Sequence, residues 1–392
     1  MANQNLTTIQ QATLLGQDEK LVKDIITYDP EAVVSNIGKK EWIYPPYSIQ
    51  SWGSWLHRIA PYVGRIKPSF AHFLIKYTSR PGDVILDPFC GIGTIPTEAS
   101  LMGRSAIGID LNPYAYYISL AKTDNKRNLE ELIEYTNKIR IDTSKIDLSK
   151  IPAWVKEYYN HETLKEILFL IKKLKKDKHY FILGCLIGIS QGHRPGHLSK
   201  PVAWTLPYKP KPDDKGEYRE SKPRLIQKLI RTYRNNFSDI GDLKTYLADA
   251  RKLPLESGSI NHIISSPPYY DTLDYVNSHR LRLAIAGYYD ESLKKKLKNE
   301  LIQRYDTYLE EMMKTIYEMR RVLKKGGYCI LVVGDCEKGK KLINTANELK
   351  PLLEKAGFTC HGIIEDEIPI NKSVQKRSKW QKHDRIMVLT KN

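Results

Sequence analysis

Short apolar runs alternate with helical stretches between residues 83 and 122, and this alternation constrains the fold more than any other feature. The run DVIL (83–86) breaks into PFCGIG, and helix-forming residues resume around Glu98 to Met102. A second apolar run, AIGID (106–110), is followed by a helical stretch at 114–122. Strands that alternate with helices predict a parallel sheet with helices on both faces.

The same pattern returns only after a long interval. NHIIS (261–265) predicts a strand, 305–323 a helix and YCILVV (328–333) another strand. Further elements follow towards the C-terminus: a helix at 341–356, a strand at 360–365 and a last strand at 385–390, which could run antiparallel at the sheet edge. The sequence therefore predicts an α/β fold, in which one doubly wound domain is interrupted in its middle.

Composition and charge narrow the class of protein. Hydrophobic residues make up 41% and charged residues 27%, which excludes a wholly disordered or membrane-embedded chain. Lys and Arg number 62 against 45 Asp and Glu, a formal charge of +17, so nucleic acid is the leading partner. A lysine-rich, solvated surface that binds nothing would give the same excess.

The cysteines and the lack of a recognisable targeting sequence indicate the cellular compartment. The five cysteines are scattered and lack the paired spacing of metal sites or disulfide frameworks, which favours a reduced, cytoplasmic setting and no metal. No signal or transit peptide is recognisable at the N-terminus. The longest apolar stretch, 181–189, is too short to span a bilayer and predicts a buried helix, so we expect no membrane partner.

A glycine loop follows the first strand, at the place where open α/β sheets bind ligands. Its residues are Asp87, Pro88, Phe89, Cys90, Gly91, Ile92, Gly93 and Thr94. Two glycines let a backbone approach a ligand closely, but packing turns and dinucleotide sites have the same outline. The carboxylate of Asp87 favours a cationic group such as the ammonium of a methionine moiety over a nucleotide phosphate.

Two further acidic residues lie next to predicted strands, one at the end of a strand and one before the start of another. Asp110, followed by Leu111 and Asn112, is positioned like the acid that hydrogen-bonds ribose hydroxyls, although a helix N-cap is the alternative interpretation. Asp249, followed by Ala250, lies just before the NHIIS strand and could accept a hydrogen bond from an adenine amino group.

The most specific text in the chain is Ser266-Pro267-Pro268-Tyr269-Tyr270, directly after that strand. Proline fixes its own φ and lacks an N–H, so the loop is stiff and its carbonyl oxygens remain free to accept hydrogen bonds. An exocyclic amine offers two N–H donors, which Ser266 Oγ and a proline carbonyl could accept. Tyr269 could stack on a base held outside the duplex.

With these two motifs, the sequence resembles the amino-group DNA methyltransferases, whose hallmarks are a cofactor loop like DPFCGIGT and a catalytic [DNS]-P-P-[YFW]. The resemblance covers about 55–122 and 247–391. It implies a Rossmann-like class I methyltransferase fold, S-adenosylmethionine as the cofactor and double-stranded DNA as the partner. It also implies that the segment 57–76 touches the methionine end of the cofactor.

The resemblance divides the chain into four parts. These are an N-terminal extension (1–45), a cofactor-binding half (46–124), an insertion (125–239) and a catalytic half (240–392). Because the cofactor loop precedes the catalytic loop, whereas many serine-type enzymes have the reverse order, the recognition sequence stays open, as do the oligomeric state and a cognate restriction endonuclease.

The insertion is the expected target-recognition region, because base edges and phosphates bind Arg, Lys, His and aromatic side chains. The residues expected to contact DNA are His193, Arg194, His197, Lys200, Trp204, Tyr208, Lys209 and Lys211, together with Tyr270 beside the catalytic loop. Any one of them taken alone would more often be a solvated or packing residue.

The first residue of the catalytic motif bears on the target base. Ser266 is typical of cytosine-N4 enzymes, whereas Asp or Asn is typical of adenine-N6 enzymes. No Pro-Cys catalytic loop occurs, so direct transfer without a covalent intermediate is favoured. The alternatives are an adenine-N6 enzyme, an RNA base-amine methyltransferase, a protein glutamine methyltransferase and a non-catalytic nucleic-acid-binding protein.

Overall fold

The computed structural model describes residues 29–49, 52–124, 128–203, 209–210, 216–233, 241–269, 274–302, 304–338, 341–367 and 383–392. The strands are β1 (Val84–Asp87), β2 (Ser105–Asp110), β3 (Leu243–Leu247), β4 (His262–Ser265), β5 (Tyr328–Gly334), β6 (Cys336–Lys338), β7 (Lys341–Ile343), β8 (Phe358–Glu367) and β9 (His383–Lys391). Seven of them form one sheet in the order β3-β2-β1-β4-β5-β9-β8, and β6 pairs with β7 in a small hairpin.

The pairing directions confirm the predicted sheet and correct its edge. β3, β2, β1, β4 and β5 are parallel, and β9 pairs antiparallel with β5 on one side and with β8 on the other. The last strand is therefore antiparallel, but it is wrong to place it at the edge, where β8 lies instead. Ile386 to Leu389 are all buried, as expected for a strand that is covered on both faces and paired on both sides.

Strand residues alternate between two hydrophobic cores. Ile85 and Ile264 pack into the core on one face, whereas their neighbours Leu86 and Ile263 pack into the core on the other. This is the two-residue period of a sheet that is covered on both faces, and it explains why these strands are short continuous apolar runs. The edge strand β3 is buried only at Leu243 and mostly exposed beyond it, and it gave no comparable signal in the sequence.

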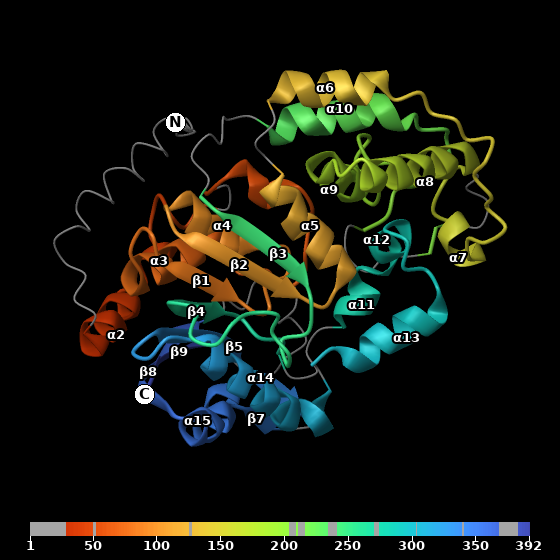
Figure 1. The fold of residues 1–392 in the computed structure, drawn as a ribbon. Helices are drawn as coiled ribbons and strands as arrows, with labels where there is room; N and C mark the ends of the chain where they lie inside the picture. The colour runs from red at the N-terminus through yellow and green to blue at the C-terminus, as the bar shows by residue number, and fades with distance from the viewer. Residues whose placement is uncertain are drawn as a thin grey trace.

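The helices that cover the first of these faces are α2 (Pro30–Gly38), α3 (Pro68–Thr78) and α4 (Thr94–Leu101). The other face is covered by α14 (Tyr308–Val322) and α15 (Thr345–Lys355), so the predicted helix at 341–356 begins only after the strand β7. α5 (Pro113–Thr123) packs against β3 and also contacts α9, which joins the sheet to the inserted helices (Figure 1). Short 3₁₀ helices lie at η1 (Glu41–Ile43), η2 (Trp55–Arg58) and η3 (Tyr305–Thr307).

A helical unit lies beside one end of the sheet (Figure 1). It contains α6 (Leu129–Lys138), α7 (Ala153–Lys156), α8 (His161–Lys176), α9 (Tyr180–Ile189) and α10 (Ser221–Thr232). As predicted, α9 is buried: every residue from Phe181 to Ile189 is shielded from solvent. Three helices from the second half of the chain, α11 (Tyr275–Ser278), α12 (Arg280–Ile285) and α13 (Glu291–Glu300), lie on the same side.

Candidate functional site

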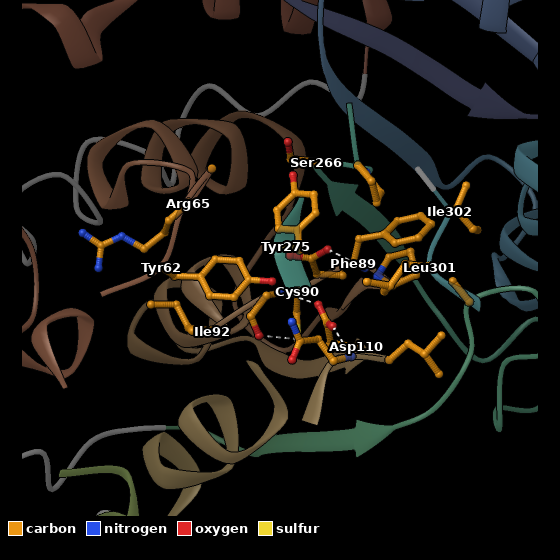
Figure 2. A pocket seen from close by; sticks show the side chains of 18 of the residues that line it. Tyr62, Arg65, Phe89, Cys90, Ile92, Asp110, Ser266, Tyr275, Leu301 and Ile302 are labelled. Carbon is orange, nitrogen blue, oxygen red and sulfur yellow. Dashed lines mark hydrogen bonds between the residues drawn. The ribbon is translucent and has the colours of Figure 1, made fainter. Parts of the chain in front are cut away.

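A cavity opens at the carboxyl ends of β1, β2 and β4 (Figure 2). We call it the strand-end cavity. It holds about 830 Å³ of empty space, a volume that includes the solvent at its open mouth. Of the residues predicted to bind the cofactor, only Gly93 does not line this cavity. Those that line it are Asp87, Pro88, Phe89, Cys90, Gly91, Thr94, Asp110, Leu111, Asn112, Asp249 and Ala250.

The glycines shape the loop between β1 and α4. Gly91 and Gly93 both have positive φ, 51° and 74°, and Gly93 is the N-cap of α4. A Cβ on Gly93 would lie 2.4 Å from Ser119 Oγ on α5, so only glycine fits there. Gly93 therefore shapes the loop from behind, while Gly91 lines the strand-end cavity.

Asp87 ends β1 and is buried, with only 2% of its surface exposed. It accepts hydrogen bonds from Ser265 Oγ at 2.6 Å and from the backbone N–H of Phe89 at 3.1 Å. Burial nevertheless raises the pKa of this carboxyl to about 7, because the two hydrogen bonds do not fully offset the cost of holding a charge away from water. A cation bound in the cavity would lower that cost.

Asp110 ends β2 and binds the backbone at both flanks. It accepts from the N–H of Gly91 at 2.8 Å and from the N–H of Asn112 at 2.8 Å, and burial raises the pKa of its carboxyl to about 6. The N-cap of α5 is Asn112, whose side chain accepts from the N–H of Tyr114. The alternative interpretation of Asp110 as the helix N-cap is therefore wrong.

Asp249 also lines the cavity and is held by Arg251. The guanidinium of Arg251 donates to both carboxylate oxygens, at 2.9 Å from Nε and 2.6 Å from Nη2, and also contacts Glu311. These bonds fix the orientation of Asp249, which still has a third of its side-chain surface exposed.

The catalytic motif reaches the same cavity through Ser266 and Pro268. Ser266 Oγ donates to the carbonyl oxygen of Val332 on β5, at 3.1 Å, which leaves its lone pairs able to accept. Tyr269 does not line the cavity. Its hydroxyl donates to Asp384 at 2.9 Å, and its ring packs on Gly334, where a Cβ would lie 2.3 Å from Cε2.

Sequence reasoning missed part of the lining. Tyr275 on α11 and the segment from Glu300 to Ile302 lie against the cavity, and neither carries a motif. Tyr62 and Arg65 come from the segment 57–76, which the resemblance had singled out without naming individual side chains. Figure 2 shows Tyr62 and Tyr275 facing the loop of Phe89 and Cys90.

Tyr62 stacks with other aromatic rings at the wall of the cavity. The ring of His279 lies 4.7 Å from it at an interplanar angle of 12°, and the ring of Tyr275 lies 6.1 Å away. His279 Nε2 also accepts the backbone N–H of Val63. Burial lowers the pKa of His279 far below its usual value, so the ring is neutral and serves to fix the wall of the cavity.

A buried polar cluster supports the cofactor loop from α4. Glu98 accepts from His57 Nε2 at 2.5 Å, and His72 Nδ1 lies 3.8 Å from its second oxygen. Burial alone would raise the pKa of Glu98, but the hydrogen bonds with both histidines outweigh it and lower the pKa to about 2. Burial lowers the pKa of His57 to about 4.

The residues predicted to contact DNA are not all at the surface. His193 and Arg194 are exposed and His197 is half-buried, whereas Lys200 is only 9% exposed and its backbone N–H donates to the carbonyl of Tyr158. Lys209 is exposed and lies 3.6 Å from Glu157. Tyr270, Trp204, Tyr208 and Lys211 lie outside the described residues.

Two general findings bear on other classes of site. In the described part of the chain, no helix is long and apolar enough to cross a membrane. The same residues contain no group of three or more His, Cys, Asp or Glu side chains that could hold a metal ion.

Known proteins are similar to parts of this chain. The chain is 34% identical to the Type II methyltransferase M.MjaII of Methanocaldococcus jannaschii over 128 residues, which cover 33% of this chain and 22% of the relative. It is 26% identical to M.BsoBI of Geobacillus stearothermophilus over 264 residues, or 57% of this chain and 52% of that one. A tRNA (guanine(10)-N2)-dimethyltransferase of Methanothermobacter thermautotrophicus is 42% identical over 52 residues, or 13% of this chain and 16% of the relative. The chain thus spans about half the length of these relatives at most.

A family described as DNA methylase, comprising N6 and N4 methyltransferases, matches residues 43–123 and 260–392, more than half of the chain. The two matched stretches contain the Asp87–Thr94 loop and the Ser266–Tyr269 motif, which the fold brings to one cavity. S-adenosylmethionine is the cofactor of this family. The chain therefore belongs to the N6/N4 DNA methylase family.

Proposed function

We propose that the chain transfers a methyl group from S-adenosylmethionine to the N4 amine of cytosine in duplex DNA. One observation carries this proposal: the Asp87–Thr94 loop and Ser266 line the same cavity, although the insertion separates them in sequence. A cofactor site and an amine-binding loop that share one cavity are the two requirements of direct transfer.

The polar lining of the cavity fits S-adenosylmethionine. Thr94 Oγ1 and Asn112 Nδ2 are buried at its wall with no hydrogen-bond partner in the described residues, so a polar ligand would satisfy them. Asp87 would hold the methionine ammonium, Asp110 the ribose hydroxyls and Asp249 the adenine amine. When bound, the cofactor supplies the electrophilic methyl group.

Ser266 and its prolines would hold the target amine. Because Ser266 Oγ donates its hydrogen bond to the carbonyl oxygen of Val332, it meets the amine as an acceptor, and a proline carbonyl of the motif can accept the second N–H. Two acceptors draw both hydrogens to one side and leave the nitrogen lone pair on the other. The nitrogen would then bond to the methyl carbon as the methyl–sulfur bond breaks and leaves its electron pair on sulfur, and the nitrogen would release one proton to solvent.

Cys90 is no alternative nucleophile. It lines the cavity, but burial raises the pKa of its thiol well above the usual value, so the reactive thiolate is disfavoured. This supports direct transfer without a covalent intermediate.

The central experiment uses labelled S-adenosylmethionine with either duplex DNA or total RNA, followed by mass spectrometry of the modified nucleoside. We expect N4-methylcytosine in DNA. N6-methyladenine would contradict the choice of cytosine alone, and label confined to RNA would contradict DNA as the substrate.

An RNA base amine is the second candidate substrate. The similarity over 52 residues to a tRNA guanine-N2 dimethyltransferase favours it, since that enzyme's name records an exocyclic amine of RNA as its target. The family membership and the serine of the catalytic motif weigh towards DNA and cytosine.

The insertion at 125–239 would recognise the target, with His193, Arg194, His197, Trp204 and Lys209 as its proposed contacts and Tyr270 next to the base. A Type II role would pair the chain with a restriction endonuclease that cleaves the same unmethylated sequence. Protection of host DNA from such a nuclease after expression of this chain would support that pairing.

A further inference from the structure

Three cations line one face of α10 at helical spacing. Arg224, Lys228 and Arg231 recur at intervals of four and three residues, so they fall on the same side of the helix. Arg231 is exposed and the other two are half-buried. Arg224 and Arg231 are separated by about 10 Å along the helix axis, at ~1.5 Å per residue.

The loop at 193–197 continues this surface. Arg224 Nε donates to the carbonyl of Pro195 at 3.3 Å, and a Cβ on Gly196 would lie 3.2 Å from Arg231 Nη2. Arg194 is exposed on the same loop. We call Arg194, Arg224, Lys228 and Arg231 the basic stripe.

The basic stripe lacks counter-charges. In the described ranges, none of its four side chains forms an ion pair, whereas lysines elsewhere on this helical unit do, such as Lys138 with Glu134 and Lys173 with Asp177. Burial lowers the pKa of Lys228, and the charges of Arg231 and Arg282 lower it further. The stripe therefore has a positive field that its own neighbours do not neutralise.

The basic stripe is tied to the strand-end cavity by a short segment. Lys228 Nζ donates to the carbonyl of Arg58 at 2.7 Å, and the chain then runs from Arg58 to Tyr62 at the cavity wall. Four residues span at most ~14 Å, which is about four base-pair steps of ~3.4 Å. Arg282 adds a second link, because it donates to the carbonyl of Gln191 and lies over the ring of Tyr114, which packs near Tyr62.

We propose that the three arginines of the basic stripe bind backbone phosphates of duplex DNA that flank the target nucleotide, while Lys228, already bound to the carbonyl of Arg58, holds the helix in place. The inference rests on the proposed function, because it takes DNA as the polyanion. Side chains that contact phosphates set the position of the duplex without reading its sequence, so the stripe would hold the strand while the cavity receives the base. The sequence had pointed to Arg194, but not to α10.

The test is the salt dependence of binding to a duplex oligonucleotide, measured by fluorescence anisotropy without the cofactor. Each phosphate contact contributes about 0.9 to the slope of log K against log of the salt concentration. We expect Arg224→Gln with Arg231→Gln to reduce that slope by about 2 and to weaken binding on the order of tenfold at low salt. Arg224→Lys with Arg231→Lys should keep most of the slope, because charge is retained.

A matched control is Lys325→Gln with Lys355→Gln. These exposed lysines precede β5 and β8 at the ends of the strands away from the cavity, and their loss should leave the slope unchanged. S-adenosylmethionine binding by every variant, measured by calorimetry, reports whether the fold is intact.

The outcomes separate the two proposals. An unchanged slope in the glutamine variant, with methyl transfer to DNA intact in the wild type, would overturn the basic stripe and leave the proposed function standing. An equal loss of slope in the Lys325→Gln and Lys355→Gln control would also overturn it. Binding of RNA but not of duplex DNA by the wild type would overturn both.

Discussion

Ser265 Oγ donates a hydrogen bond to Asp87 Oδ1 at 2.6 Å, and this bond joins the strand before the catalytic motif to the strand before the cofactor loop. Both residues are buried at the carboxyl ends of adjacent parallel strands. The two halves of the site are therefore held at a fixed spacing by a direct contact.

Asp87→Asn should weaken cofactor binding and stabilise the protein without cofactor. The pKa of Asp87 is raised from 3.8 to about 7, so its contribution to stability is present below pH 3.8 and lost as the pH rises through about 7. Asparagine carries no charge and avoids that loss, a gain of about 1–3 kcal/mol in the free energy of unfolding at pH 8. Calorimetric titration and chemical denaturation measure the two effects.

The same carboxyl predicts a pH dependence of the wild type. Affinity for S-adenosylmethionine should fall as the pH drops through about 7, because protonated Asp87 no longer attracts the ammonium group. The asparagine variant should show a flatter profile. Equal pH profiles for the two proteins would mean that another group binds the ammonium.

His57 predicts acid sensitivity of the fold. Its pKa is lowered from 6.5 to about 4, so it contributes stability above pH 6.5 that is lost as the pH falls towards 4. His57→Gln should remove roughly 3 kcal/mol of this pH-dependent change. Denaturation at pH 7.5 and pH 4.5 measures it, and His161→Gln, at an exposed position, is the matched control.

Tyr269 should act on the base and not on the cofactor. Tyr269→Ala should lower kcat/KM roughly 5- to 150-fold, since stacking on a base contributes ~1–3 kcal/mol, while S-adenosylmethionine binds almost as before. Tyr269→Phe keeps the ring and loses the hydrogen bonds of the hydroxyl with Asp384 and Ser266, so it should stay close to the wild type. A phenylalanine variant as impaired as the alanine one would show that the hydroxyl matters more than the ring.

Gly93→Ala should damage both stability and cofactor binding. It combines a positive φ of 74° with a Cβ only 2.4 Å from Ser119 Oγ. Gly82→Ala shares the positive φ, 90°, but meets no atom within 4 Å, so it isolates the backbone strain of about 1–3 kcal/mol. Thermal unfolding and cofactor titration of the two variants should differ by the effect of the clash, and identical losses would exclude it.

The sequence determined the fold class, because each central strand is a short apolar run next to a helix of regular period. It also identified the Asp87–Thr94 loop and Ser266–Tyr269, since glycines and prolines restrict the backbone locally. The local sequence did not predict β3, because most of its residues are exposed and it has no clear hydrophobic pattern. It also could not show that β9 lies between β5 and β8.

Only the tertiary structure decided which side chains share a surface. Lys200 belongs to a basic run of sequence but is buried, whereas Tyr62 and Tyr275 have no motif and line the cavity beside Ser266. Tyr269 lies against Gly334, and α10 adds Arg224 and Arg231 to the loop of Arg194. The physical reason is that a motif constrains a few consecutive dihedral angles, whereas burial and juxtaposition depend on packing between segments that are distant in the chain.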